Sequence, residues 1–412
     1  MPKIVIANFY PVWPIKGGGQ RRIFFLAREL SRAFEVEIIA PVYDRQGSMT
    51  RFSDTLVETR IPVERTYASL AASLQKIVPL TSDLAYTKYW QSCRLYQSEL
   101  QRVARDADAL VTAHPYSIYA LLDARGSRST PIVFDSQNVE VTQKKSVLSG
   151  HPHFLDEIRA VEQKAIAEAA LIIACSQADA QQFHALYGLE ASRVELVENG
   201  VDALAVPLMS EDVRDRVRAE VGLQNRFAAL FAGSYHHPNL QAVDHILRWA
   251  AQNTSIVFMF LGSICDYKPL KESPLGNVVR LGQVDETVKW VAFQIADIGL
   301  NPMELGSGTN VKMFEYAAAR VPVLTTPFGA RGIPLKDGRE CIIRPIEDFF
   351  QELCVQETGD ESARKALAER ARTKIIETSD WTVIGEKYQD CFTRLIGSSR
   401  RNHEQSTKAP FL

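Results

Sequence analysis

The sequence lacks several features that would each point to a particular class of protein. Its six cysteines are scattered and contain no C-x-x-C pair, so we expect reduced thiols in a cytoplasmic protein. No run of about 18 apolar residues occurs, so no membrane-spanning helix is predicted. The strand-like run 4–7 is too short for the apolar core of a signal peptide. A formal net charge of −2 argues against a nucleic-acid partner.

The remaining composition is that of an ordinary globular protein with an α/β pattern. The chain has 412 residues, 46% of them hydrophobic and 23% charged, which predicts two or three domains. Short apolar strands alternate with amphipathic helices, and this series occurs twice. We therefore predict two Rossmann-like, doubly wound parallel-sheet domains. The expected strands are residues 4–7, 36–40, 109–112, 132–134, 171–174, 195–197, 228–232, 256–261, 278–281, 298–300, 323–325 and 341–343.

A turn signal divides the two series. Asn199-Gly200 follows a predicted strand, and Asn-Gly is a strong turn signal. We expect an N-terminal domain over 1–203 and a C-terminal domain over 204–378. A helix over 379–397 is expected to pack back on the N-terminal domain, and 398–412 is expected to be a flexible tail. Since ligands of open α/β sheets lie outside the carboxyl ends of the strands, two such domains facing each other would form an interdomain cleft.

The most informative segment of the sequence is a small-residue loop between a strand and a helix. The strand 298–300 leads into the loop 306–309, and a helix is predicted over 310–320. Backbone N–H groups at a helix N-terminus, preceded by glycines, form a ready site for phosphate. A plain tight loop is the alternative. Asn310 is also explained as an N-cap residue.

Two charged side chains on this predicted helix strengthen the phosphate interpretation. Lys312 lies in the first turn, where the helix dipole disfavours a cation unless a phosphate offsets it. Glu315 lies one turn further, and its side chain leans back toward the helix start. A carboxylate accepts hydrogen bonds only, which suits paired ribose hydroxyls. Phosphate with ribose predicts a nucleotide site, although Glu315 is otherwise an ordinary solvated helix residue.

An aromatic and basic segment over residues 67–96 allows two interpretations. It contains Tyr86, Lys88, Tyr89, Trp90 and Arg94. Such a mixture suits peripheral contact with a membrane or with a lipid-linked acceptor. The alternative is a helical region that packs its own aromatic side chains.

Several segments, taken together and in order, resemble the retaining glycosyltransferases of family 4, which have the GT-B fold. The resemblance covers about residues 1–397. It is carried by the opening strand, glycine loop and helix over 3–30 and by the Asn199-Gly200 turn. The other segments that carry it are 134–140, 169–180, 231–234 and 237–239.

The resemblance implies a role for each matching residue. His114, after the strand 109–112, would contact the donor sugar, whereas a lone histidine is more often structural. Gly17-Gly18-Gly19 would be a mobile loop over the donor phosphate, or else a flexible turn. Asn138 and Glu140 would contact the acceptor or brace a loop. The expected catalytic residues are His114, Lys312 and Glu315, and the expected donor contacts are Gly18, Gly19, Gly233, Ser234, Gly306, Ser307, Gly308, Thr309, Asn310, Val311 and Glu315.

The implied activity is transfer of a sugar from a nucleotide-sugar to a saccharide, lipid-linked or small-molecule hydroxyl acceptor, with retention of configuration. No metal or other cofactor is expected, and polysaccharide, glycolipid or natural-product glycoside synthesis is the expected setting. Two departures from the family pattern leave a second hypothesis open. Ser307 stands where the family often has a glutamate, and Ser234 stands where many members have an arginine. A degenerate paralogue that only binds an active transferase is therefore the alternative.

Overall fold

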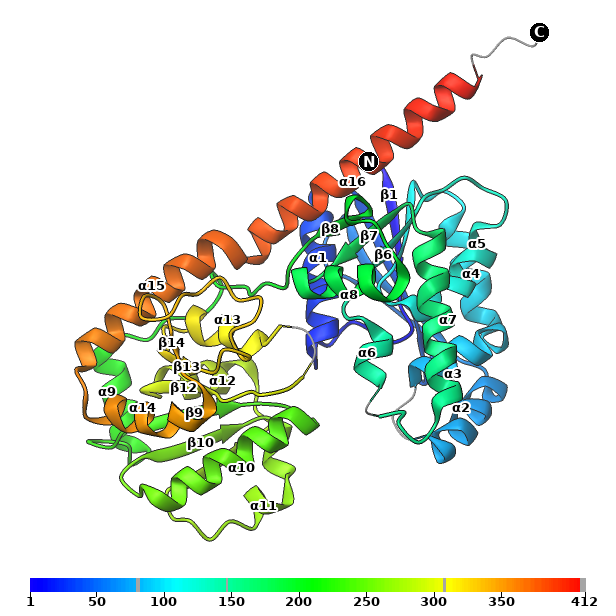
Figure 1. Ribbon diagram of the computed structural model, residues 1–412. Helices are drawn as coiled ribbons and strands as arrows, with labels where there is room; N and C mark the ends of the chain where they lie inside the picture. Colours follow the sequence, from blue (N-terminus) through cyan, green and yellow to red (C-terminus); the bar gives the residue numbers. More distant parts are fainter. Residues whose placement is uncertain (79–81, 146, 307–308, 408–412) are drawn as a thin grey trace. The chain divides into compact units, whose positions relative to one another are not determined.

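The chain forms two compact units, each built around its own sheet (Figure 1). The computed structural model describes residues 1–78, 82–145, 147–306 and 309–407. The first unit comprises Met1–Asn199 together with Ile384–Leu412, and the second comprises Gly200–Val383.

The first unit contains a sheet whose strand order is β3-β4-β2-β1-β5-β6-β7-β8, with every pairing parallel except β3 with β4. The strands are β1 (Lys3–Ala7), β2 (Glu35–Val42), β3 (Ser48–Arg51), β4 (Leu56–Pro62), β5 (Ala109–Thr112), β6 (Ile132–Asp135), β7 (Leu171–Ala174) and β8 (Val194–Leu196). The helices are α1 (Gly18–Leu30), α2 (Arg65–Ile77), α3 (Ser82–Tyr89), α4 (Arg94–Ala104), α5 (Ile118–Arg125), α6 (Glu140–Lys144), α7 (Pro152–Glu168) and α8 (Gln177–Tyr187), with 3₁₀ turns at Trp90–Ser92, Pro115–Ser117 and Ala191–Arg193.

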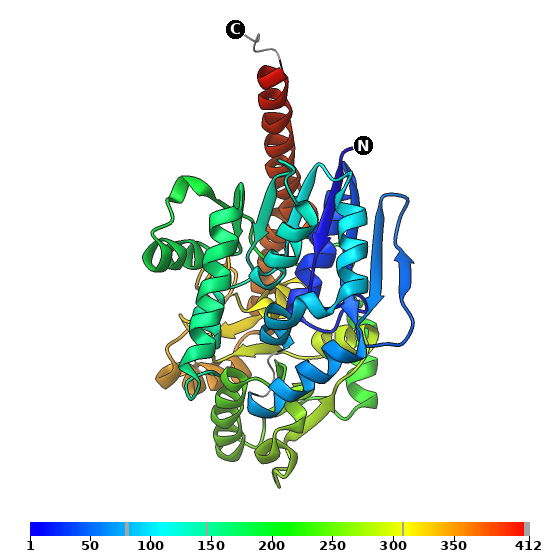
Figure 2. The same ribbon diagram turned by 90° about the vertical axis from the view of Figure 1, so that its right-hand side faces the viewer.

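Sequence reasoning missed β3 and β4, the edge hairpin of this sheet (Figure 2, blue). Strand β4 carries charges and ends in proline, so it gives no apolar run. Its Glu58 is nonetheless buried, because the carboxylate accepts hydrogen bonds from the backbone N–H groups of Val12 (2.5 Å) and Trp13 (3.3 Å). A buried carboxylate that caps a loop looks like a surface residue in the sequence.

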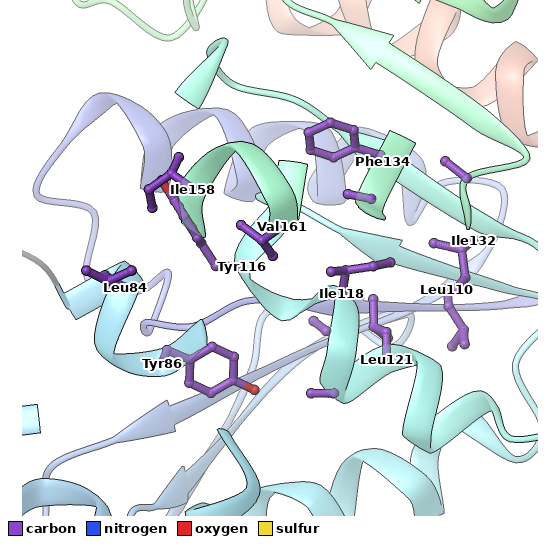
Figure 3. Packing of buried hydrophobic residues seen from close by; sticks show 14 of the residues in the cluster. Leu84, Tyr86, Leu110, Tyr116, Ile118, Leu121, Ile132, Phe134, Ile158 and Val161 are labelled. Atoms are coloured by element: carbon purple, nitrogen blue, oxygen red, sulfur yellow. The ribbon is translucent and has the colours of Figure 1, made fainter. Parts of the chain in front are cut away.

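The aromatic segment 67–96 supplies part of the first unit's core. Tyr67, Tyr86 and Tyr96 are buried, and Tyr86 lies among the core side chains shown in Figure 3. Lys88 pairs with Glu157 at 2.7 Å. The self-packing interpretation is therefore confirmed for these tyrosines, whereas membrane contact through the rest of the segment stays a prediction. Within the described residues, no helix is both long and apolar enough to cross a membrane.

The second unit contains a six-stranded parallel sheet of order β11-β10-β9-β12-β13-β14. Alternate residues of its strands pack on both faces: Leu230 joins the cluster that includes α13, whereas Phe231 joins the cluster that includes α10. The strands are β9 (Ala228–Ala232), β10 (Val257–Leu261), β11 (Val278–Gly282), β12 (Ile298–Asn301), β13 (Val323–Thr325) and β14 (Ile342–Ile343). The helices are α9 (Glu211–Glu220), α10 (His237–Gln252), α11 (Lys268–Lys271), α12 (Glu286–Gln294), α13 (Val311–Ala318), α14 (Ile346–Thr358) and α15 (Glu361–Ser379), with a 3₁₀ turn at Ser263–Asp266.

Both sheets reverse their strand order at one point. In the first unit the chain fills one side of β1 and then crosses to β5, and in the second unit it fills one side of β9 and then crosses to β12. Helices leave in opposite directions at such a point, so the carboxyl ends of the two central strands border an open crevice. The reversals at β1/β5 and at β9/β12 therefore locate a candidate site in each unit.

A buried ion pair organises the first unit. Arg22 of α1 contacts Asp135, at the end of β6, at 2.8 Å, and the two side chains are 3% and 4% exposed. Arg22 also donates to the backbone carbonyl of Glu198 at 3.0 Å. Tyr388 of α16 (Trp381–Thr407) donates to the other carboxylate oxygen of Asp135 at 3.1 Å. Residues from three distant parts of the sequence thus converge on one pair of charges.

The chain passes between the units twice, at 199/200 and at 383/384. On the second-unit side these two passages are hydrogen-bonded to each other, since Val201 N donates to Ser379 O (2.9 Å) and Trp381 N donates to Val201 O (3.0 Å). The Asp380 carboxylate accepts from Ala203 N at 2.9 Å. The passages therefore leave the second unit as a bonded pair.

The C-terminal helix is longer than predicted. It was expected to end near residue 397, with a flexible tail over 398–412, but α16 continues to Thr407. Gly397, Ser398 and Ser399 are weak helix formers, yet no proline follows them before the helix ends, so nothing forces an earlier end. The predicted end of the helix is therefore wrong, whereas the flexibility expected of 398–412 stays a prediction.

We predict that the Arg22–Asp135 pair is essential to the first unit. Arg22→Met should lower its free energy of unfolding by about 3–5 kcal/mol, because an unpaired buried carboxylate remains. Urea denaturation measures this loss. Lys164→Ala, which removes a surface pair with Glu168, is the control and should cost less than about 0.5 kcal/mol. Equal losses in the two variants would contradict the prediction.

Candidate functional site

The turn after β9 is fixed by close backbone packing. Gly233 N donates to Leu261 O at 2.9 Å. Gly262 has a φ of 101°, and a Cβ there would lie 2.3 Å from the carbonyl oxygen of Gly233, so both the conformation and the space require glycine. Asn239, in the first turn of α10, donates to Ser234 O at 2.9 Å. The predicted residues Gly233 and Ser234 thus border the β9/β12 crevice on a rigid turn.

Helix α13 is anchored to the sheet at the other side of the same crevice. Its Tyr316 hydroxyl accepts from Ala232 N at 2.8 Å and donates to Leu230 O at 3.2 Å. A Cβ at Gly299 of β12 would lie 2.8 Å from the Tyr316 ring, so the helix lies directly on the strand. This contact fixes the first two turns of α13, which carry Lys312 and Glu315.

Lys312 is held between the two helix starts. Its Nζ donates to Asn239 Oδ1 at 3.0 Å and lies 4.0 Å from the centroid of the Phe231 ring. Burial lowers the pKa of Lys312 to about 7, although the negative charge of Glu315 opposes this shift. The site therefore contains a partly desolvated ammonium group whose charge would be stabilised by an anion.

Glu315 lies one turn beyond Lys312 and already has a protein partner. The Nζ of Lys289, on α12, is 3.2 Å from Glu315 Oε1. The Glu315 side chain is only 14% exposed, so it is not the solvated helix glutamate of the alternative interpretation. Lys289 was not singled out from the sequence, because a lysine in an amphipathic helix gives no signal of a partner on another helix.

The segment before α13 is only partly described. Ser307 and Gly308 lie outside the described residues, so their predicted donor contacts have no structural account. Asn310 occupies the N-cap position of α13, but its side chain makes no capping hydrogen bond and donates instead to Gly329 O at 3.1 Å. Asn310 is therefore the N-cap residue by position, as the alternative interpretation has it, but its side chain does not cap the helix. Val311 follows as the first helical residue.

Two more groups border this segment. Arg331 Nη2 donates to Gly306 O at 3.4 Å, and the Thr309 hydroxyl would lie 3.3 Å from a Cβ at Gly332.

Burial lowers the pKa of His236, with a smaller effect from His237, so His236 is neutral at pH 7. Among the described residues, no group of three or more His, Cys, Asp or Glu side chains is arranged to hold a metal ion.

The first unit's reversal point holds a hydrogen-bonded chain of side chains. His114 follows β5, and its Nδ1 lies 3.2 Å from Glu140 Oε1. Its Nε2 lies 2.9 Å from the hydroxyl of Tyr10, which follows β1. Because a carboxylate only accepts, His114 donates from Nδ1 to Glu140. Tyr10 was not predicted, since a tyrosine after a strand has no distinguishing pattern.

Glu140 is a bracing residue in this structure, and its predicted contact with an acceptor stays a prediction. It is buried, and its second oxygen accepts from Tyr116 at 2.6 Å. Burial acts to raise the pKa of Glu140, but the bonds from His114 and Tyr116 and the charge of Lys144 outweigh it and lower the pKa. The carboxylate thus stays ionised and orients His114. Asn138 lies two residues before Glu140 and is partly exposed, and its backbone carbonyl oxygen accepts from the Ser136 hydroxyl.

The glycine segment is a helix start and not a free loop. Gly18 and Gly19 are the first residues of α1, with Gly17 at the N-cap. A Cβ at Gly19 would lie 2.8 Å from the Tyr10 hydroxyl and 2.7 Å from Gln137 Oε1. The expectation of a mobile loop is therefore wrong for these two glycines, because close packing requires glycine at residue 19.

The six cysteines are unpaired, as predicted, and all but Cys354 are buried. Burial raises the pKa of the Cys175 thiol, which donates to Gln137 O at 3.1 Å. These thiols are packing residues of the two units, and none belongs to the β9/β12 crevice.

Solved structures share the fold of the whole chain. Sucrose-phosphate synthase from Thermosynechococcus elongatus matches with a TM-score of 0.74 at 14% identity, over 97% of this chain and 100% of that chain. Anabaena Alr3699/HepE, solved in complex with UDP-glucose, matches with a TM-score of 0.69 at 13% identity, over 95% of this chain and 99% of that chain. At these identities the likeness concerns the fold alone.

Sequence comparisons identify the family. The family models described as Glycosyltransferase Family 4 and Glycosyl transferases group 1 match residues 16–203 and 226–355. D-inositol 3-phosphate glycosyltransferase 1 of Catenulispora acidiphila is 34% identical over 128 residues, which span 31% of this chain and 29% of that relative. The predicted fold class is confirmed, and the chain belongs to the family 4, group 1 glycosyltransferases of GT-B fold.

Proposed function

We propose that this chain transfers a sugar from a nucleotide-sugar donor to a hydroxyl acceptor with retention of anomeric configuration. The observation that carries the proposal is the β9/β12 crevice, where Lys312 and Glu315 lie on successive turns at the start of α13. A cation and a carboxylate spaced by one helical turn suit the diphosphate and the ribose of one nucleotide. The UDP-glucose complex of HepE, a protein of the same fold, supports this choice of donor class.

The diphosphate would bind at the first turn of α13. Free amide groups at a helix start favour phosphate, and the Asn310 side chain makes no capping hydrogen bond to those of this turn. Lys312, which is hydrogen-bonded to Asn239, would stabilise the charge that develops on the departing diphosphate. Retention would follow from same-face attack, in which the leaving phosphate oxygen takes the acceptor proton.

The remaining parts of the proposal concern the acceptor and the setting of the reaction. The role of His114 toward the donor sugar stays a prediction, as do the cytoplasmic location, the absence of a metal requirement and the acceptor contact of Asn138. A saccharide, lipid-linked or small-molecule acceptor fits the proposal, with polysaccharide, glycolipid or natural-product glycoside synthesis as its setting. The serine at position 234 favours the second hypothesis, a catalytically degenerate partner of another transferase.

We predict that one nucleotide stabilises the protein. A thermal-shift panel with UDP, GDP, ADP, dTDP and CMP at millimolar concentration should give a raised midpoint with one of them, since a ligand that binds the native state stabilises it. The matching nucleotide-sugar should then be hydrolysed slowly. If no nucleotide shifts the midpoint, the proposal is wrong and the degenerate-partner hypothesis replaces it.

We predict that Glu315→Ala weakens binding of that nucleotide by at least about 1.5 kcal/mol, because hydrogen bonds to a charged group contribute roughly 1.5–3 kcal/mol. Isothermal titration calorimetry measures the change. Glu347→Ala, at an exposed position of α14, is the matched control and should bind like the wild type. An unchanged affinity in folded Glu315→Ala protein would rule out the ribose assignment.

We also predict that nucleotide affinity falls as the pH rises from 7 to 9. Lys312 has a pKa of about 7 in the free protein, so it loses its charge over this range, while the bound diphosphate favours the charged form. The dissociation constant should rise by up to about tenfold per pH unit, with proton uptake on binding. Lys312→Met should bind weakly at pH 7 and show a flat profile. A flat profile in the wild type would contradict the assignment.

A further inference from the structure

The structure contains a second lysine at this crevice that the proposed mechanism does not use. Lys289 lies in the middle of α12, and its side chain is only 11% exposed. Its Nζ is 3.2 Å from Glu315 Oε1, 2.7 Å from Glu286 Oε2 and 4.1 Å from the centroid of the Trp290 ring. Lysine is rarely buried without a partner, so this position calls for a physical reason.

The need of the Lys289 ammonium group for a charged partner does not by itself explain why it lies beside Glu315. Glu286, one turn earlier on the same helix, offers a carboxylate that is 61% exposed. A lysine paired only with Glu286 could keep its ammonium group in water. The side chain instead reaches across to Glu315, on the helix that begins at the β9/β12 crevice. The inward contact therefore serves Glu315 more than it serves Lys289.

The Lys289–Glu315 contact stabilises a carboxylate that is largely removed from water. Glu315 is mostly buried, and burying a carboxylate costs free energy unless a cation or a hydrogen-bond donor lies close to it. Lys289 supplies a cation by direct contact with Glu315, at 3.2 Å. A bond from one ammonium group uses part of the acceptor capacity of a carboxylate, which has about four lone-pair sites.

We propose that Lys289 is a positioning residue that holds the Glu315 carboxylate in one orientation for the two ribose hydroxyls of the donor nucleotide. The inference rests on the proposed function and deepens it, because it assigns discrimination between ribose and deoxyribose to a pair of residues. Trp290, under the ammonium group, limits the directions that the Lys289 side chain can take. Without Lys289, the nucleotide itself would have to order the carboxylate, and hydroxyl recognition would weaken.

The test compares UDP with 2′,3′-dideoxy-UDP, which keeps the base and both phosphates and lacks the hydroxyls. The wild type should bind UDP at least tenfold more tightly. Lys289→Met should weaken UDP binding at least fivefold and change dideoxy-UDP binding less than twofold, as measured by calorimetry. Glu286→Gln, which removes only the outer partner of Lys289, is the matched control and should keep the wild-type ratio. Lys289→Arg should restore most of the preference.

Equal weakening of both ligands by Lys289→Met would show a merely structural role and overturn the inference, as would no weakening of either. If Lys289→Met does not fold, Lys289→Gln provides the same comparison with a smaller change in polarity. Glu315→Ala separates the two levels of the argument. A lost preference for UDP in Glu315→Ala, with the preference kept in Lys289→Met, overturns the inference alone. A preference kept in Glu315→Ala overturns the ribose assignment on which the inference rests.

Discussion

Parallel strand pairing is the constraint on which the rest of this molecule depends. Each parallel neighbour requires a crossover connection, usually a helix, and crossovers of one hand fill one side of a sheet before the chain must begin the other. Both units meet this constraint with the same reversal, at β1/β5 and at β9/β12. The chemistry follows from it, since Tyr10, His114, Lys312 and Glu315 all lie just beyond the strands at these two points.

The charges at the β9/β12 crevice depend on one another. Glu315 lies between a lysine that touches it, Lys289, and one that senses its charge, Lys312. Burial lowers the pKa of Lys312, and the negative charge of Glu315 partly offsets this shift. This arrangement supports the proposed ligand, which brings negative charge to one end of the crevice and hydroxyl groups to the other. No single residue of the three gives this property.

Sequence reasoning predicted the parts of the fold that repeat simple patterns. The strands at 109–112, 171–174, 228–232 and 323–325 have the predicted bounds, and the other predicted strands differ by one or two residues at an end. It failed where a polar side chain is buried for a partner far away in sequence. Glu58, Glu140 and Lys289 all look like surface residues, because only the folded chain brings their partners to them. For the same reason the positions of Lys312 and Glu315 were predictable from the helix, whereas their environment was not.

The Arg22–Asp135 pair has a mechanical consequence. Arg22 donates a hydrogen bond to the carbonyl of Glu198, which lies just before the first passage between the units. Tyr388 lies just after the second passage and donates a hydrogen bond to Asp135. The two passages also leave the second unit bonded to each other through Val201. Both ends of a two-stranded tether are thus fixed, one at a single buried charge pair and the other at a short ladder. The tether therefore resists being pulled apart or twisted as two separate strands, and the residues that fix its ends are not among the predicted site residues.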